Sequence, residues 1–311
     1  MKVLVTGAAG FIGSHVSDAF IERGHDVVIL DNLTSGKLEN LNPKATFVQG
    51  DITDKQLVDS LFREHKFEIV NHHAAQLDVR KSVADPIFDA NQNIIGTLTL
   101  LEAAREAGSL KRFMFASTGG AIYGEQDYFP ADEKHPARPI SPYGITKRSV
   151  ELYLHYYKEI YCMDYTSFRY TNVYGPRQNA HGEAGVVAIF INKLLSGDQA
   201  TIHGTGGQTR DYVYVGDVVR AHMLAVEKMT GSDIFNVSTE KETDVNEIFT
   251  ILSQHTTGGE AKAHHGPAKA GEQMRSVCSY DHIKSVLGWE PKVNLAEGLQ
   301  ETVASFQAQV A

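Results

Sequence analysis

Short apolar runs rich in β-branched residues alternate with longer amphipathic stretches along the first half of the chain. The runs show no polar alternation, which is typical of strands that are covered on both faces. The stretches between them follow helical spacing, and two of them, 11–24 and 97–108, end in a glycine suited to a helix C-cap. Strand and helix in regular alternation predict a parallel, doubly wound α/β sheet. The predicted strands are Val3–Val5, Val27–Leu30, Ala45–Val48, Glu68–Val70, Arg112–Phe115 and Tyr165–Phe168.

The composition and charge of the chain limit the binding partners and the cellular compartment that we expect. The 311 residues are 42% apolar and 22% charged, and the net charge of −9 argues against a nucleic-acid or anionic-membrane partner. The two cysteines, Cys162 and Cys278, lack a thiolate-motif spacing, so we expect no disulfide framework and a reducing cytoplasm. The chain runs straight into a strand, and no apolar run approaches the roughly 18 residues of a membrane span. We therefore expect neither secretion nor membrane insertion.

A glycine motif, 7-GAAGFIGSH-15, links the first predicted strand to the first predicted helix. Gly7 permits a tight turn, Gly10 lets the backbone approach a pyrophosphate, and Gly13 lets the helix pack on the strand. The helix N-terminus adds unpaired N–H groups and partial positive charge. Such a loop alone could be a bare turn, but Asp31 ends the next strand, where a carboxylate can accept bonds from ribose hydroxyls. The combination predicts NAD as the cofactor, because Asp31 would repel the 2′-phosphate of NADP.

The order of elements loosens after about residue 171, where 175–185 and 255–273 look like long loops. Loops of that length in a compact protein are more often functional than idle. We therefore expect an NAD-binding Rossmann domain over residues 1–171, completed by part of 207–238. A smaller C-terminal α/β domain, mainly residues 172–311, is expected to bind the substrate.

Two further motifs carry candidate chemistry. Tyr143 and Lys147 lie about one helical turn apart in 142-PYGITK-147. A free tyrosine titrates near about 10, so a neighbouring ammonium that stabilises the phenolate would make it a base at neutral pH. Ser117 and Thr118, in 117-STGGAIYG-124, add two hydroxyls at a predicted strand end. A Tyr-Lys pair alone also suits a solvated helix face, but all these motifs converge on the carboxyl edge of one sheet, where such folds bind ligands.

Together the motifs resemble the extended short-chain dehydrogenase/reductases, and specifically the NAD-dependent UDP-hexose 4-epimerases. The resemblance covers nearly the whole chain, through VTGAAGFIGSH, DNLTSG, GDI, HHAA, SPYGITK, RYTNVYGPRQ, GTGGQTRDYVYVGDV and LGWEPKVNLAEGL. It implies that the protein interconverts UDP-glucose and UDP-galactose at C4 by transient oxidation to a 4-keto sugar. It also implies a homodimer formed through helices such as 88–106 and 143–160.

The resemblance implies roles for the residues of the first domain. Tyr143 resembles the catalytic base, and Lys147 the residue that binds the nicotinamide ribose and lowers the tyrosine pKa. Thr118 or Ser117 resembles the hydroxyl that bonds the sugar O4; many relatives carry a serine one place later, where this chain has Gly119, and we favour Thr118. The implied contacts to NAD are Gly7, Gly10, Phe11, Ile12, Gly13, Asp31, Asn32, Ser35, Gly36, Asp51, Ile52, His73, Ala74, Ala75, Asn93, Tyr143, Lys147 and Tyr170.

The implied substrate contacts lie mostly in the second half. Besides Thr118 and Tyr143, Arg210 resembles an arginine that binds the diphosphate of a UDP-sugar, and its fork suits phosphate geometry. Asn172 resembles an amide that contacts the substrate. The backbone at Val186-Val187 resembles an edge that contacts uracil and phosphate. An exposed ion-paired arginine, a turn asparagine and a plain helix start would have the same spacing.

Two positions depart from the family pattern. Relatives commonly carry an arginine at the start of the segment KAGEQMRS and another three residues after its glycine; this chain has Lys269 and Met274, with Arg275 one place further. Lys269 keeps the charge without a bidentate fork, so we expect Arg210 and Arg275 to hold the diphosphate. Ser276 takes the place of a size-determining side chain beside the sugar C2 substituent. Its small size predicts tolerance of UDP-N-acetylhexosamines.

Several residues near these motifs have simpler explanations. Asp51 could reach the adenine amino group or merely cap a helix. His72-His73 is expected to pack and to contact the cofactor through its backbone, and Tyr170 is by itself more typical of a core aromatic. Neither His72-His73 nor His264-His265 has a third ligand at a recognisable spacing, so no metal is predicted.

Three other functions stay open. A nucleotide-sugar 4,6-dehydratase shares fold and cofactor but carries an Asp-Glu pair after the threonine, whereas Gly119-Gly120 follows Thr118 here, so water elimination lacks its acid. A net dehydrogenase or reductase would exchange its cofactor at each turnover. A non-catalytic NAD-binding protein is the third alternative, since fold alone does not fix function. The joint presence of Tyr143, Lys147 and a hydroxyl argues against it.

Overall fold

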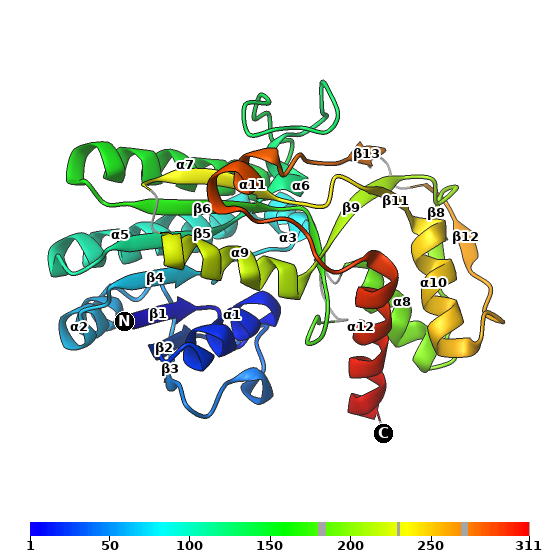
Figure 1. Ribbon diagram of the computed structural model, residues 1–311, viewed down its shortest axis with the longest axis horizontal. Helices are drawn as coiled ribbons and strands as arrows, with labels where there is room; N and C mark the ends of the chain where they lie inside the picture. Colours follow the sequence, from blue (N-terminus) through cyan, green and yellow to red (C-terminus); the bar gives the residue numbers. More distant parts are fainter. Residues whose placement is uncertain (180–184, 229–230, 269–272, 311) are drawn as a thin grey trace. The chain divides into compact units, whose positions relative to one another are not determined.

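The computed structural model describes residues 1–179, 185–228, 231–268 and 273–310 (Figure 1). Its largest sheet has seven strands in the order β10-β6-β5-β4-β1-β2-β3. β1 pairs in parallel with β2 and β4, and the pairs β2–β3 and β4–β5 are parallel too. Helices separate most consecutive strands, so the predicted Rossmann-type, doubly wound sheet is confirmed. The strands are β1 (Lys2–Thr6), β2 (Asp26–Asp31), β3 (Thr46–Gln49), β4 (Ile69–His72), β5 (Arg112–Thr118), β6 (Tyr165–Tyr170) and β10 (Asp233–Val237).

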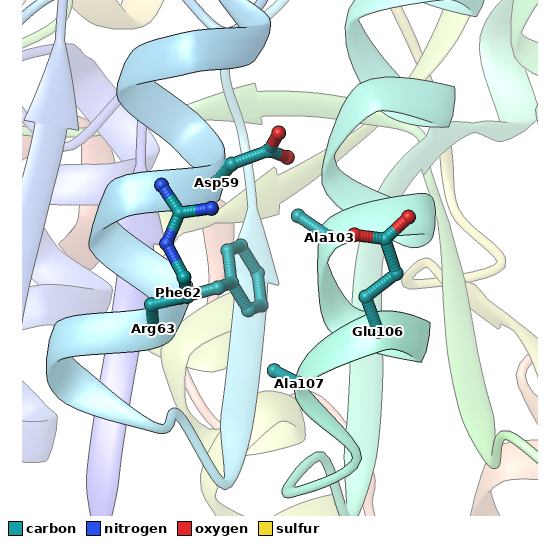
Figure 2. A pocket seen from close by; sticks show the side chains of 6 residues that line it. All are labelled: Asp59, Phe62, Arg63, Ala103, Glu106 and Ala107. Atoms are coloured by element: carbon teal, nitrogen blue, oxygen red, sulfur yellow. The ribbon is translucent and has the colours of Figure 1, made fainter.

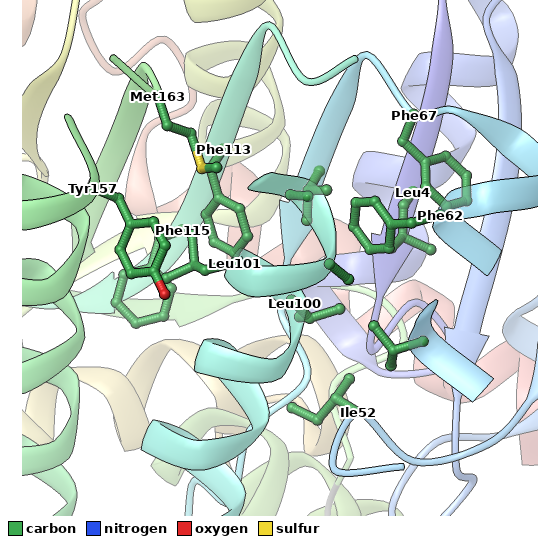
Figure 3. Close-up of a cluster of buried hydrophobic side chains, with 14 of the residues drawn as sticks. Leu4, Ile52, Phe62, Phe67, Leu100, Leu101, Phe113, Phe115, Tyr157 and Met163 are labelled. Atoms are coloured by element: carbon green, nitrogen blue, oxygen red, sulfur yellow. The ribbon is translucent and has the colours of Figure 1, made fainter. Parts of the chain in front are cut away.

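One face of this sheet carries a large apolar core. Alternate strand residues, such as Leu4 on β1 and Phe113 on β5, pack there against α2, α5 and α7 (Figure 3). Each fully buried side chain of this size contributes about 1.5–3 kcal/mol to stability. The helices of this part of the chain are α1 (Phe11–Glu22), α2 (Lys55–His65), α3 (Val79–Ala84), α4 (Pro86–Ala90), α5 (Gly96–Ala107), α6 (Gly119–Ile122), α7 (Pro142–Tyr161) and α9 (Val215–Lys228), with a short 3-10 helix η1 (Leu38–Asn40) and a π-helix η2 (Asn91–Ile95).

Helices α1 and α9 cover the other face, and Figure 1 shows both in front of the strands. α1 contacts β1 and β2. α9 places the ring of His222 over Phe168 of β6, with centroids 4.2 Å apart. The strands are therefore buried on both sides, which explains their continuous apolar character.

The strand order reverses between β1 and β4, and in open α/β sheets ligands bind outside the carboxyl ends of the strands at this point. The loops after the two strands touch there. The His73 amide donates to the Thr6 carbonyl oxygen at 3.1 Å, and a Cβ on Gly7 would lie 2.6 Å from the Ala74 nitrogen. Gly7 also has a φ of +70°, so this contact requires glycine.

The chain divides into two compact units. The first comprises Met1–Gly124, Ala137–Arg169 and Val219–Phe235, and the second comprises Glu125–Pro136, Tyr170–Val218 and Asn236–Ala311. The segment Glu125–Pro136 therefore leaves the predicted first domain. It does so because Ala131 exchanges backbone hydrogen bonds with Val277 and Ser279, at 3.0 and 2.9 Å. No periodicity in the sequence encodes that pairing.

The second unit holds two small sheets with their own apolar core. β9 pairs with β11, β13 and β7, and β8 pairs with β12. Helices α8, α10 and α12 pack together beside them. Among the residues that the structure describes, no helix is long and apolar enough to cross a membrane. The elements are β7 (Asn172–Tyr174), β8 (Thr201–His203), β9 (Thr209–Tyr214), β11 (Glu242–Asp244), β12 (His264–Gly266), β13 (Arg275–Ser276), α8 (Val186–Leu195), α10 (Val245–Thr257), α11 (Asp281–Leu287) and α12 (Leu295–Val310).

Candidate active site

The glycine motif forms the turn between β1 and α1. Gly10 is the N-cap of α1, and no side chain caps the helix, so its first N–H groups are left for another acceptor. A Cβ on Gly13 would lie 2.5 Å from the Gly7 carbonyl oxygen, which explains why the helix can start this close to the strand. A Cβ on Gly10 would meet only that same oxygen, at 3.1 Å. The turn therefore presents backbone and open space, as a pyrophosphate requires. Phe11 and Ile12 form the first turn of α1.

Asp31, at the end of β2, is hydrogen-bonded to this turn. Its carboxylate accepts from the amide of Ala9 at 2.9 Å and from the amide of Leu33 at 2.8 Å. Gly36 packs against the same turn, because a Cβ there would lie 2.6 Å from the Ala9 Cβ. Ser35, just before it, is exposed. The acidic strand end is thus joined to the glycine motif, as an adenosine ribose site requires.

Asp51 lies beside this site and does not cap a helix. The N-cap of α2 is Asp54, whose side chain accepts from the Leu57 amide. Asp51 accepts from Asn32 Nδ2 at 2.7 Å and from the amide and hydroxyl of Thr53 at 2.9 and 2.7 Å. Burial raises the pKa of Asp51, but these hydrogen bonds outweigh it and leave the pKa below its ordinary value. Ile52, the next residue, is buried in the core beside α5.

Two uncharged histidines, His72 and His73, lie at the end of β4 and at the start of the loop that follows it. His72 is held between the hydroxyls of Thr6 and Thr97, at 2.7 and 2.9 Å. Burial, and then the charge of Lys147, lowers the pKa of His73 to about 3. The His73 Nε2 is buried without a hydrogen-bond partner among the residues described. This orphaned atom and the half-buried Ala74 and Ala75 line the switch-point loop.

Lys147, in the second turn of α7, is almost fully buried. Its Nζ donates to the Ala116 carbonyl oxygen at 2.8 Å and lies 5.8 Å from the centroid of the Tyr143 ring. Burial lowers the pKa of Lys147 to about 8, against the opposing charges of Asp89 and Glu151. The structure therefore brings the ammonium next to the tyrosine, as the spacing predicts.

The two hydroxyls at the end of β5 have different surroundings. Ser117 is buried, and its Oγ donates to Glu151 at 2.8 Å. Thr118, the next residue on the strand, points to the other side and is half-buried. The α6 turn that follows Thr118 packs on α7, where a Cβ on Gly144 would lie 2.5 Å from the Ala121 carbonyl oxygen. Ser117 thus belongs to the interior of the unit, whereas Thr118 is the more exposed of the two hydroxyls.

A buried ion pair below Lys147 was missed by the sequence interpretation. Glu151 accepts from Arg169 Nε and Nη2 at 2.9 and 2.7 Å, as well as from Arg148 at 3.0 Å. Burial raises the pKa of Glu151, but the bonds from Arg169 and Ser117 outweigh it and lower the pKa overall. The available signal was the spacing, because Glu151 follows Lys147 by four residues and so shares its helix face.

Asn93 also has an unpredicted environment. Its amide donates to the Gln76 carbonyl oxygen at 2.9 Å and to Asp89 at 3.0 Å, while its Oδ1 accepts from the Gln76 amide at 2.8 Å. Asn93 thus fastens the loop after β4 to η2. Tyr170, at the end of β6, is buried to 5% exposure and falls in the second unit.

In the second unit, Arg210 and Ser276 share one face of the small sheet. They are direct partners in the register of β9 and β13, and paired residues point to the same side. Arg210 Nη1 donates to the Thr209 carbonyl oxygen at 2.8 Å. Asn172, on β7, donates to the Asp211 carbonyl oxygen at 3.2 Å. Val186 and Val187 open α8, and Val187 is buried.

The expectation that Arg275 joins Arg210 is wrong for this structure. Arg275 precedes Ser276 on β13 and so points to the opposite face. There it forms a bidentate pair with Glu242 and stacks on the Phe129 ring, with the guanidinium carbon 3.9 Å from the centroid. The neighbouring ion pair, which the sequence spacing does not show, accounts for the difference. Lys269 lies outside the described residues.

A separate hollow lies between α2 and α5 in the first unit (Figure 2). None of the residues that line it is a predicted site residue. The hollow is bordered by charged side chains from both helices and has no connection in sequence with the motifs above. Its lining comprises Asp59, Phe62, Arg63, Ala103, Glu106 and Ala107.

The first unit defines the class of the protein as a dinucleotide-binding fold of the short-chain dehydrogenase/reductase type. A family model described as the NAD dependent epimerase/dehydratase family matches residues 3–238, and the chain belongs to this family. This confirms the resemblance and NAD as the cofactor. The uncapped α1 terminus, the open space at Gly10 and the Asp31 carboxylate fit that cofactor.

Solved structures of similar chains agree. A UDP-glucose 4-epimerase from Thermotoga maritima, solved with UDP-glucose, is 49% identical and matches with a TM-score of 0.97 over 100% of both chains. A UDP-glucose 4-epimerase from Thermus thermophilus in complex with NAD is 44% identical, with a TM-score of 0.93 over 99% of both chains. A UDP-N-acetylglucosamine 4-epimerase from Methanobrevibacter ruminantium, in complex with UDP-N-acetylmuramic acid, is 34% identical, with a TM-score of 0.92 over 99% of this chain and 98% of that one.

Proposed function

We propose that the protein is an NAD-dependent isomerase that interconverts UDP-glucose and UDP-galactose at C4. The observation that carries the proposal is the pair of Tyr143 and buried Lys147 on α7, in a unit whose β1–α1 turn fits NAD. The family membership and the activities named for the similar structures support it.

Within this proposal the side chains of the first unit move and hold the proton. Tyr143, as phenolate, takes the proton of the C4 hydroxyl, and Thr118 hydrogen-bonds the same oxygen. Lys147 stabilises the phenolate because its ammonium lies beside the ring in a site shielded from water. When bound, NAD would supply the redox chemistry, with NAD⁺ as the hydride acceptor from C4 and NADH as the hydride donor to the opposite face of the 4-keto sugar.

The second unit has a different task in the proposal. Arg210 binds the diphosphate, with Asn172 and the start of α8 at Val186-Val187 as further contacts to the nucleotide sugar. A fixed nucleotide lets the hexose turn over while it stays bound. Because Arg275 is paired with Glu242 on the opposite face of β13, the proposal assigns the diphosphate to Arg210 without Arg275. Lys269 is retained as a proposed contact on sequence grounds alone.

The residues after Thr118 favour epimerisation over dehydration. Gly119 and Gly120 open α6, where a dehydratase carries an acidic pair. A Cβ on Gly120 would meet nothing closer than the Thr118 hydroxyl at 3.9 Å. There is room for an acidic side chain after Thr118, but glycines stand there. Without that acid the 4-keto sugar cannot lose water, so it is reduced again.

The direct test is to incubate the purified protein with UDP-galactose and no added cofactor. The proposal predicts formation of UDP-glucose to equilibrium, measured by NMR or chromatography. In a parallel incubation with a nucleotide-linked glucose, a 4-keto-6-deoxy product would favour the dehydratase. Steady accumulation of NADH after addition of NAD⁺ would favour a net dehydrogenase.

Ser276 is proposed to set the substrate range. It is buried on the Arg210 face of β13, and a small residue there leaves room for an N-acetyl group at C2. We expect the wild type to convert UDP-N-acetylglucosamine as well as UDP-galactose. We expect Ser276→Tyr to lower kcat/KM for UDP-N-acetylglucosamine, relative to kcat/KM for UDP-galactose, about tenfold or more. The tyrosine ring would occupy the space of the N-acetyl group, and a steric mismatch of this kind costs roughly 1–3 kcal/mol. Ser276→Ala is the matched control, and an unchanged ratio in Ser276→Tyr would contradict this role.

We also propose a homodimer. α7 exposes an apolar strip of Ile145, Leu152, Tyr153, Tyr156 and Ile160, with exposures between 39% and 59%. A contiguous strip of this kind marks an interaction surface. We expect light scattering to show a dimer for the wild type and a monomer for Leu152→Glu, because a charge would have to be buried. Glu64→Gln on α2 serves as an exposed control, and a monomeric wild type would refute the dimer.

The proposal finally places the protein in the cytoplasm. Cys162 and Cys278 are both free thiols in the structure, and a reducing compartment keeps them so. A UDP-sugar partner also suits this compartment. Fractionation of cells that express the tagged chain would test the location.

A further inference from the structure

A buried carboxylate, Asp89, lies beside the proposed catalytic pair, and the mechanism above does not use it. Asp89 is on α4 and its exposure is 0%. Its Oδ1 accepts from Gln76 Nε2 at 2.9 Å and from Asn93 Nδ2 at 3.0 Å, and its Oδ2 accepts from the Thr146 hydroxyl at 2.9 Å. Burying a charge costs stability unless the charge is paired. These three partners are neutral side chains, so none of them pairs with the negative charge of Asp89.

Thr146 links Asp89 to the proposed catalytic turn. It immediately precedes Lys147, and its hydroxyl also lies 2.9 Å from the carbonyl oxygen of Tyr143. The amide of Tyr143 is held in turn by Ser82 Oγ on α3 at 3.2 Å. The first two turns of α7, which carry the two members of the pair, are therefore tied to α3 through Ser82 and to α4 through Asp89.

Asp89 is also the uncompensated anion near Lys147. The charged or titratable groups that face Lys147 come from three elements. They are Tyr143 and Glu151 on α7, Asp89 on α4, and His72 and His73 at the end of β4 and just after it. Burial keeps the two histidines neutral. Glu151 also raises the pKa of Lys147, but its charge is opposed by Arg169, with which it is paired in two hydrogen bonds. Asp89 has no such cation bonded to it among the residues described.

We propose that Asp89 is a positioning residue of the active site. Its carboxylate fixes the α7 turn through Thr146 and supplies the negative charge that offsets the buried Lys147 ammonium. The inference rests on the proposed function for the roles of Tyr143 and Lys147. The link between Asp89 and Lys147 itself can be measured without turnover.

Asp89→Asn removes the charge and keeps the shape. The asparagine oxygen can accept from Gln76 and Asn93, and its NH₂ group can donate to the Thr146 oxygen, whose proton then turns to the Tyr143 carbonyl. We expect a lysine ¹³C NMR titration, assigned with Lys147→Met, to show Lys147 with a pKa near about 8 in the wild type and a lower pKa in Asp89→Asn. Asp164→Asn, which removes a carboxylate paired with Lys158, should leave the titration unchanged. An unchanged Lys147 titration in folded Asp89→Asn overturns the proposal.

The pH profile of kcat gives the second readout. Well below pH 8 Lys147 is protonated in both proteins, so their kcat values should be close. As pH rises, Lys147 should lose its proton at a lower pH in Asp89→Asn than in the wild type. A downward shift of one pH unit means about a tenfold lower kcat on the alkaline limb. A uniform loss at all pH values, with an unmoved limb, would show a merely structural role and overturn the proposal.

Thr146→Val tests the positioning link from its other end and covers the case in which Asp89→Asn does not fold. The charge of Asp89 is retained, so the Lys147 titration should match the wild type. We expect kcat to fall about tenfold without a change in KM, because a misplaced proton-transfer group slows the chemical step, and Thr146→Ser should restore it. An unchanged kcat in Thr146→Val overturns the positioning role. If the wild type fails to convert UDP-galactose, the proposed function fails while the titration still reports on Asp89.

Discussion

Replacement of Tyr143 by phenylalanine is expected to lower kcat by about 10³-fold or more. The change removes the single oxygen that takes the C4 proton, and a positioned acid or base contributes about 10²–10⁴-fold to such a step. Lys147 cannot replace it, because its Nζ is buried and donates to the Ala116 carbonyl oxygen. The measurement is the initial rate of UDP-glucose formation from UDP-galactose, with KM expected to change little.

Two controls accompany this variant. The amount of NAD released on denaturation should match that of the wild type, which shows that the site is intact. Tyr161→Phe, at the exposed end of the same helix, should retain wild-type activity. Equal rates for wild type and Tyr143→Phe would refute the assigned base.

Removal of Arg169 is expected to lower the free energy of unfolding by about 3–5 kcal/mol, because it breaks a buried pair and leaves the buried Glu151 with only the part-exposed Arg148 as a cation. Arg169 is 3% exposed and donates twice to Glu151 and once to the Tyr123 hydroxyl at 3.0 Å. Denaturant unfolding of Arg169→Leu measures the change. Arg23→Gln, which breaks an exposed pair with Glu227 at 3.6 Å, is the control and should cost at most about 1 kcal/mol.

The pH dependence of this loss has a definite sign. The folded-state pKa of Glu151 is below its ordinary value, so its contribution is present above the ordinary value of 4.5 and is lost as pH falls through the folded-state pKa. The difference between wild type and Arg169→Leu should therefore shrink in acid. A loss of under about 1 kcal/mol at neutral pH would contradict a stabilising role for this pair, which joins β6 to α7.

Much of the first unit could be predicted because its signals are local. Apolar runs and helical spacing gave the strands and the doubly wound order, and the glycine motif with Asp31 gave the cofactor. The helical spacing of Tyr143 and Lys147 was sufficient to place them on one side of α7. In each case the relevant partners are neighbours in sequence or belong to one strand-turn-helix unit.

The remaining features depend on partners that are distant in sequence. The choice between Ser117 and Thr118 required the position of Glu151, which occupies the serine. Arg275 required the register of a two-residue strand and the ion pair with Glu242. The assignment of Glu125–Pro136 to the second unit depends on an isolated strand bridge and on hydrogen bonds to the distant residues Asn236 and Val277.

Isotope tracing tests the central claim most directly. UDP-galactose deuterated at C4 is incubated with purified protein and no added cofactor, and the product is isolated. Transient oxidation at C4 predicts UDP-glucose that retains deuterium at C4, with no build-up of NADH absorbance. UDP-glucose that has lost the label to solvent, or no UDP-glucose at all, would contradict it.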